Sequence, residues 1–142
     1  MRFPLLCFCS ALLALASATA SAQTIFLVRH AERADAGKTT QPDPGLSAAG
    51  QDRAQVLAQT LRDAKIEVIF VTEFHRTQET AQPLAEKLGL QPVVVSAKET
   101  AQLVAKLKAA HGNVLVVGHS NTLPEIMKSL GAGAGSRRTG IR

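Results

Sequence analysis

Short apolar runs rich in Val, Ile and Leu alternate along this sequence with longer stretches of helical periodicity. Residues 25–28, 66–72, 92–96 and 113–117 are expected to be strands. Residues 47–63, 77–88, 99–111 and 121–130 are expected to be helices. Strands that are apolar along nearly their whole length are buried on both faces, so the alternation predicts a mostly parallel sheet with helices on each side. The expected fold class is a three-layer α/β/α domain.

Cap and turn residues set the limits of the expected helices. Ser47 is placed to cap the first helix, which is expected to carry Val56, Leu57, Leu61 and Ala64 at helical spacing. Gly89 is the expected residue after the second helix, and Pro83 within that helix predicts a kink or a late start. The polar segment 33–46 is long for a connection, which is typical of loops that shape a binding site.

The first 22 residues have the layout of a secretory signal peptide. Arg2 is followed by an apolar run over 3–16 and then by Ala20-Ser21-Ala22, which fits the cleavage rule before Gln23. The run is shorter than a membrane-spanning helix needs, so an uncleaved anchor is the less favoured alternative. We expect cleavage after Ala22 and a periplasmic or secreted protein without stable membrane association.

The expected mature chain contains no cysteine, so its chemistry depends mainly on His, Arg and acidic side chains. Both cysteines, Cys7 and Cys9, fall in the signal segment, which excludes a disulfide or a cysteine nucleophile after cleavage. The net charge of +5 is concentrated at the ends of the chain, because four arginines lie there. These are Arg2, Arg137, Arg138 and Arg142. No basic face with interleaved aromatic residues is visible, so nucleic acid is not an expected partner. We expect one domain over 23–131 and a flexible basic tail over 132–142.

Cationic and near-cationic side chains follow three of the expected strands. Arg29 and His30 end the first, His75 and Arg76 follow the second, and His119 follows the fourth. The carboxyl ends of parallel strands share one edge of a sheet, where ligands bind. Two arginine forks suit a phosphate group, and a neutral histidine can attack phosphorus while a second one stabilises charge.

Three motifs in order resemble those of the histidine phosphatase superfamily, in particular its short branch with small bacterial phosphohistidine phosphatases. They are "LVRHAE", "TEFHRTQETA" and "VVGHSNT", and the helix "LSAAGQDRAQVLA" lies between the first two. The resemblance extends over about residues 24–131 and implies a phosphoglycerate mutase-like fold. It implies that His30 is the nucleophile that forms a phosphohistidine intermediate. It also implies that Arg29 and Arg76 bind the phosphoryl oxygens and that His119 completes the pocket.

The resemblance assigns lesser roles to residues around this centre. Ser120 and Asn121 would shape the loop beside His119, and Glu32 would support the nucleophile or contact substrate. The family's proton-donating glutamate has no clear match, and Glu99 is the weak candidate. No metal or organic cofactor is implied. The expected substrate is a phosphorylated small molecule or phosphoprotein, as a phosphomonoester or phosphoramidate.

Other interpretations of these residues are weaker. Gly118-His119-Ser120 resembles a serine-hydrolase turn, but that motif needs Gly where Thr122 stands, and no Asp or His follows Ser120. His75 is expected at the rim of the site and His111 at a helix end. The chain ends in "GAGAGSRRTGIR", where family members usually continue into a further strand. An inactive phospho-ligand-binding member, or a truncated remnant of the same fold, is therefore the alternative to an active phosphatase.

Overall fold

The computed structural model describes residues 22–34 and 42–132. The elements are β1 (Ile25–Arg29), α1 (Ala48–Leu61), β2 (Ile66–Val71), α2 (His75–Leu88), β3 (Val93–Val94), α3 (Thr100–Ala109), β4 (Asn113–Gly118) and α4 (Leu123–Ser129). Within these ranges, none of the helices combines the length and the apolar character that crossing a membrane requires. Most of the expected signal peptide, the middle of the long loop and the expected tail from residue 133 lie outside the described residues.

The sheet has the strand order β1-β4-β2-β3, and every neighbouring pair is parallel. β4 is central, and its residue Gly118 lies opposite Arg29 at the end of β1. This register brings the carboxyl ends of β1, β4 and β2 to one edge, as expected from the apolar strands. The prediction of a parallel sheet is confirmed.

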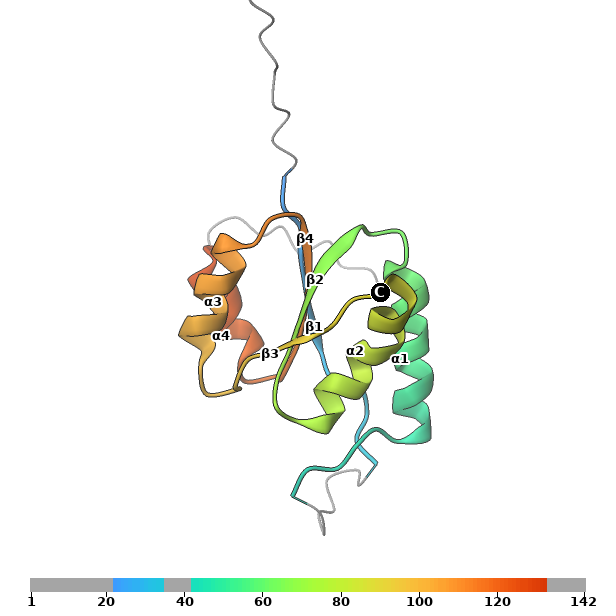
Figure 1. Ribbon diagram of the computed structural model, residues 1–142. Helices are drawn as coiled ribbons and strands as arrows, with labels where there is room; N and C mark the ends of the chain where they lie inside the picture. The colour runs from blue at the N-terminus through green and yellow to red at the C-terminus, as the bar shows by residue number, and fades with distance from the viewer. Residues whose placement is uncertain (1–21, 35–41, 133–142) are drawn as a thin grey trace, which may run out of the picture.

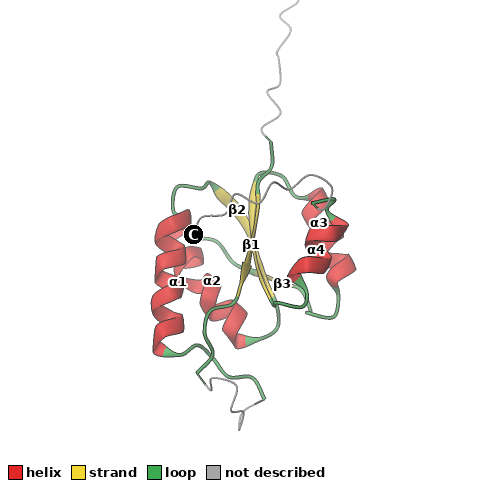
Figure 2. Cartoon of the chain, turned by 180° about the vertical axis from the view of Figure 1, so that it is seen from behind, coloured by secondary structure: helices red, strands yellow, loops and turns green. Residues whose placement is uncertain are grey.

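Two helices cover each face of this sheet (Figures 1 and 2). α1 and α2 lie on one side, and α3 and α4 lie on the other. Alternate residues of β4 face the two layers, because Leu115 and Val117 belong to one core cluster while Val114 and Val116 belong to the other. The three-layer α/β/α fold class is therefore confirmed.

The third strand and the second helix differ from expectation. β3 contains only Val93 and Val94, both exposed, instead of residues 92–96. It is an edge strand, so pairing from a single neighbour limits its length. α2 begins at His75, not at residue 77, and includes Pro83. A residue of the long loop stabilises this earlier start, because the carboxylate of Asp43 accepts the His75 N–H at 3.0 Å.

The buried face of α1 is formed by small residues. Gly50, Ala54, Ala58 and Leu61 are buried, whereas Val56 is 63% exposed. The small side chains allow α1 to pack closely on its neighbours. Of the predicted apolar residues, Leu61 is buried and Leu57 and Ala64 pack against the core, whereas Val56 does not lie on this face. Ser47 caps the helix as predicted, since its hydroxyl accepts the Gly50 N–H at 3.1 Å.

Candidate active site

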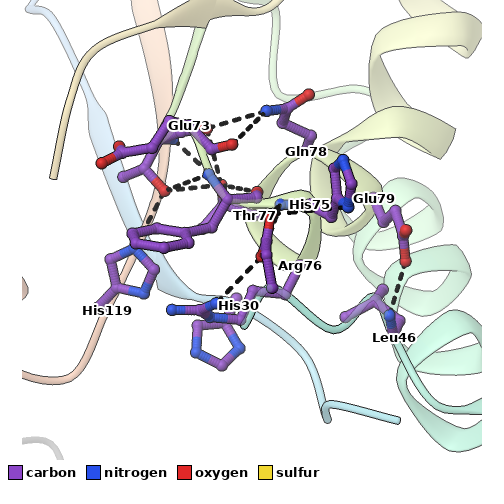
Figure 3. A network of polar contacts seen from close by, with 12 residues as sticks. His30, Leu46, Glu73, His75, Arg76, Thr77, Gln78, Glu79 and His119 are labelled. Carbon is purple, nitrogen blue, oxygen red and sulfur yellow. Dashed lines mark hydrogen bonds and ion pairs between the residues drawn. The ribbon is translucent and has the colours of Figure 1, made fainter. Parts of the chain in front are cut away.

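Arg29, His30, Arg76 and His119 converge at the carboxyl edge of the sheet. The His30 backbone N–H donates to the Gly118 carbonyl at 3.0 Å, which continues the pairing of β1 with β4 past the end of the strand. The ring centroids of His30 and His119 are 5.4 Å apart in an edge-on arrangement. Figure 3 shows both rings beside Arg76. The structure therefore brings together the four residues that the sequence placed in one pocket.

Hydrogen bonding determines which nitrogen of His30 is available for reaction. Nδ1 lies 2.8 Å from the carbonyl oxygen of Ala31. A carbonyl can only accept, so Nδ1 carries the proton and Nε2 of the neutral ring keeps its lone pair. The segment itself is fixed, because the Ala31 N–H donates to the Thr80 hydroxyl at 2.9 Å. His30 is thus oriented as a nucleophile that attacks through Nε2.

His119 has the opposite tautomer, which follows from counting the protons in a buried chain of two threonines. The Thr77 hydroxyl donates its single proton to a carbonyl, since the oxygens of Phe74 and Thr72 lie at 2.8 and 3.2 Å. The 2.9 Å contact between the Thr72 and Thr77 hydroxyls then requires the proton of Thr72. With that proton used, the 3.0 Å contact between Thr72 Oγ1 and His119 Nε2 requires Nε2 to donate. Nδ1 of His119 is therefore the nitrogen that gains or loses a proton.

Both histidines are biased toward the neutral form. Burial lowers the pKa of His30, and the charges of Arg76, Arg29 and Arg33 lower it further, against the hydrogen bond to Ala31. Burial and the neighbouring charge of Arg76 lower the pKa of His119 to about 4. A neutral His30 is the form that can attack phosphorus.

These shifts predict the titration of the two rings. On acidification from pH 8, the Cε1 protons of His30 and His119 should still show mainly the chemical shift of neutral imidazole at pH 6.5, the ordinary pKa of histidine. His119 should begin to move only toward pH 4. NMR of histidine-labelled protein tests this, and a His119 midpoint at or above pH 6.5 would contradict the assigned environment.

Thr72 is expected to fix the tautomer of His119. Thr72→Val preserves shape but leaves the buried Nε2–H without its acceptor, at a cost of about 1–3 kcal/mol. We expect a mixture of His119 tautomers in the ¹⁵N spectrum, whereas Thr72→Ser should keep the Nε2–H form. Thr60→Val on the exposed face of α1 is the matched control. A wild-type spectrum with the proton on Nδ1 would refute the chain of donors.

Arg76 is held by a loop residue and an aromatic ring. Asp43 accepts from Arg76 Nη1 at 3.4 Å while it also accepts the first backbone N–H of α2. The Phe74 ring lies 4.2 Å from the guanidinium carbon and packs edge-on against His119. These roles of Asp43 and Phe74 were not predicted from the sequence. Asp43 lies far from Arg76 along the chain, and no local pattern marks the contact.

Glu73 joins two segments near the site and was not predicted from the sequence to do so. Its carboxylate accepts the Ala97 N–H at 2.8 Å and the Ser96 hydroxyl at 3.4 Å, which ties the end of β2 to the loop before α3. Burial would raise the pKa of Glu73, but these hydrogen bonds outweigh it and lower the pKa. The group is therefore ionised at neutral pH and is suited to hold the loop, not to donate a proton.

The remaining predicted residues lie outside the central four. Ser120 and Asn121 are exposed in the turn after His119, but the turn is held by Thr122, which accepts the His119 N–H at 3.2 Å. Glu32 forms an ion pair with Arg53. Glu99 is exposed at the start of α3.

A further histidine lies at the border of the site. His75 is exposed, with Nδ1 3.6 Å from Asp43, which fits its expected place at the rim. Over the described ranges, no group of three or more His, Cys, Asp or Glu side chains is arranged to hold a metal ion.

Two arginines and two histidines at the carboxyl edge of a parallel sheet are side chains that suit a phosphoryl group. The family model of the histidine phosphatase superfamily (branch 1) matches residues 25–98. The chain belongs to this superfamily.

Known proteins similar to this chain fit that family. A 72-residue segment is 38% identical to the "Probable phosphoglycerate mutase GpmB" of Yersinia enterocolitica, over 49% of this chain and 34% of that protein. The chain thus spans about a third of that curated relative, and only 10% of another. The structure of the protein histidine phosphatase SixA with tungstate superposes with a TM-score of 0.58 at 21% identity, over 72% of this chain and 73% of that one. Mycobacterial glucosyl-3-phosphoglycerate phosphatase gives 0.61 at 19% identity, over 73% and 76%. At these identities the superpositions show the shared fold.

Proposed function

We propose that this protein is a phosphatase that hydrolyses a phosphomonoester or phosphoramidate through a phosphohistidine intermediate. The observation that carries the proposal is the state of His30. Its Nδ1 proton is committed to the Ala31 carbonyl, so the lone pair of Nε2 is available beside Arg76 and His119.

The reaction has two steps in which His30 is the covalent carrier. Nε2 attacks phosphorus, the bond from phosphorus to the leaving oxygen or nitrogen breaks, and the leaving group takes up a proton. Arg29 and Arg76 hold the phosphoryl oxygens, and His119 faces the same group through Nδ1. Water then attacks the phosphohistidine, which releases inorganic phosphate and restores His30.

Hydrolysis is favoured over a mutase reaction because the acidic candidates Glu99 and Glu73 are not placed to donate a proton to a leaving group. The predicted donor Glu99 is exposed, and Glu73 is bonded to the neighbouring loop. Substrates with easy leaving groups, such as a phosphoramidate or an aryl phosphate, are therefore the proposed ones. The histidine phosphatase activity in the name of SixA supports this substrate class.

The first test is turnover of p-nitrophenyl phosphate by the full chain. In a parallel experiment, labelled phosphate is trapped on the protein and the stability of the phosphoprotein in acid and in base is measured. Phosphatase activity with an acid-labile, base-stable phosphoprotein is expected. A folded protein that binds inorganic phosphate without turnover would support the alternative, a non-catalytic phospho-ligand-binding member, and would refute the enzyme proposal.

We also propose that the protein acts outside the cytoplasm, in the periplasm or after secretion. The support is the composition of residues 1–22 and the position of Gln23, the residue after the expected cleavage site. Its side chain donates to the Ala110 carbonyl at 2.9 Å, next to the end of α3. N-terminal sequencing of exported protein should begin at Gln23, and an intact Met1 in the mature protein would contradict export by cleavage.

A further inference from the structure

Thr80, on the second turn of α2, contacts the backbone of two segments that meet at the site. Its hydroxyl donates to the carbonyl of Arg76 at 2.6 Å and accepts the N–H of Ala31 at 2.9 Å. Ala31 directly follows His30, and its side chain and that of Thr80 are both buried. The Thr80 side chain therefore joins the helix that bears a phosphate-binding arginine to the segment that bears the nucleophile.

The single hydroxyl proton of Thr80 fixes the direction of this connection. A carbonyl can only accept, so the Arg76 carbonyl takes the Thr80 proton, and Oγ1 keeps its lone pairs for the Ala31 N–H. The Ala31 carbonyl in turn accepts the Nδ1 proton of His30 at 2.8 Å. Hydrogen bonds thus run in one direction from the His30 ring, through Ala31 and Thr80, to the backbone of Arg76.

Apolar packing gives residue 31 little support of its own. The Ala31 side chain is a single methyl group, and it lies in a small buried cluster with Leu46 and Ala54. A pocket of about 250 Å³ borders both Ala31 and Thr80. This pocket gives the peptide room to shift once the bond to Thr80 is lost. The hydrogen bond, more than the packing, therefore determines where the acceptor of the His30 proton lies.

We propose that Thr80 is a positioning residue for the covalent step, because it holds the Ala31 peptide so that Nε2 of His30 faces the bound phosphoryl group. Thr80 acts through Ala31 and His30 and leaves the chemistry unchanged: the bond from Nε2 to phosphorus forms, and the bond to the leaving group breaks. The inference rests on the proposed function for its effect on the rate, but the orientation of His30 can be measured without turnover.

The test compares Thr80→Val with Thr80→Ser in the full chain. Valine keeps the shape of the side chain but removes the acceptor of the Ala31 N–H. We expect kcat/KM for p-nitrophenyl phosphate to fall by about 10- to 100-fold, because a small displacement of the nucleophile is enough for such a loss. The Kd of inorganic phosphate, measured by calorimetry, should change by about twofold or less, since the arginines remain. In the ¹⁵N spectrum, the Nδ1–H form of His30 should give way to a mixture of tautomers. Thr80→Ser should restore the rate and the tautomer.

Two matched controls separate positioning from a general loss of stability. The Thr60 hydroxyl makes the same bond to the carbonyl four residues earlier, at 2.8 Å, on the exposed face of α1, so Thr60→Val should change neither readout. Glu79, next to Thr80 in α2, accepts the N–H of buried Leu46 at 2.6 Å. Glu79→Ala also leaves a buried amide without its partner, but that amide lies at the end of the long loop. It should lower the temperature of unfolding and leave the His30 tautomer as in the wild type.

Each outcome decides a definite part of the inference. Wild-type kcat/KM and tautomer in Thr80→Val would overturn it, and so would an equal change of the tautomer in Glu79→Ala. If the wild type shows no turnover, the tautomers still decide the role of Thr80, and the phosphatase proposal alone fails. If Thr80→Val does not fold, hydrogen exchange of the Ala31 N–H in the wild type decides. Slow exchange would support the inference, and exchange at the rate of an exposed amide would overturn it.

Discussion

His30→Ala is expected to reduce kcat for p-nitrophenyl phosphate by about 10⁴-fold or more and to abolish labelling of the protein by phosphate. The variant lacks the nucleophilic nitrogen Nε2 at residue 30, so no phosphohistidine can form. Binding of a phosphonate should survive, because Arg29 and Arg76 remain. Steady-state kinetics and calorimetry on the same preparation measure the two effects separately.

His111→Ala is the matched control for this variant. His111 is exposed next to Gly112, on the turn between α3 and β4 and away from the site edge of the sheet. Its loss should leave kcat and labelling unchanged. Retained labelling in His30→Ala would transfer the covalent role to another residue and would remove the basis of the proposed mechanism.

The fold and the central site could be predicted because both depend on short-range patterns. Apolar runs such as residues 113–117 indicate buried parallel strands, and the side chains just past such strands must lie at the same edge. Arg29, His30 and His119 occupy such positions, so their convergence required no knowledge of side-chain packing. Arg76, in the first turn of the following helix, is placed by the same rule.

The rest depends on contacts between segments that are distant in sequence. Thr72 looks like an ordinary strand residue, and only the packed structure shows its hydroxyl between His119 and Thr77. The bond from Asp43 to the start of α2 shifted the helix boundary, which local propensity could not reveal. Leu57, Leu61 and Ala64 pack on the core as their spacing predicts, but Val56 is exposed. The buried Gly50 and Ala54 were not predicted because they contribute little to apolar periodicity.

The two tautomers give the site a chemical asymmetry that its symmetric composition hides. His30 presents an unprotonated Nε2, and His119 presents Nδ1 while its Nε2–H is held by Thr72. A bound phosphoryl dianion would offset the arginine charges that lower the pKa of His119. Ligand binding should therefore favour a proton on Nδ1, where it can donate to a phosphoryl oxygen.

Arg76→Met is expected to lower kcat/KM by about 10²- to 10³-fold, because the transferring group loses a charged fork that is in place before reaction. Methionine keeps much of the apolar stem against Phe74, so the fold should persist. The same variant should raise the pKa of His119, since Arg76 is the strongest charge that lowers it. Kinetics and the histidine NMR titration therefore give two independent readouts of one substitution.

Arg76→Lys and Asp43→Asn separate the charge of Arg76 from its orientation. Lysine restores the charge but not the planar fork, so it should recover the His119 titration more fully than it recovers kcat/KM. Asp43→Asn keeps an oxygen that accepts the His75 N–H but weakens the pairing with Arg76, so its loss of kcat/KM should be smaller. Arg62→Met, at an exposed arginine after α1, should change neither readout. If Arg76→Lys equals the wild type in kcat/KM, the guanidinium acts as a diffuse charge, and the fork geometry assigned to the clamp is wrong.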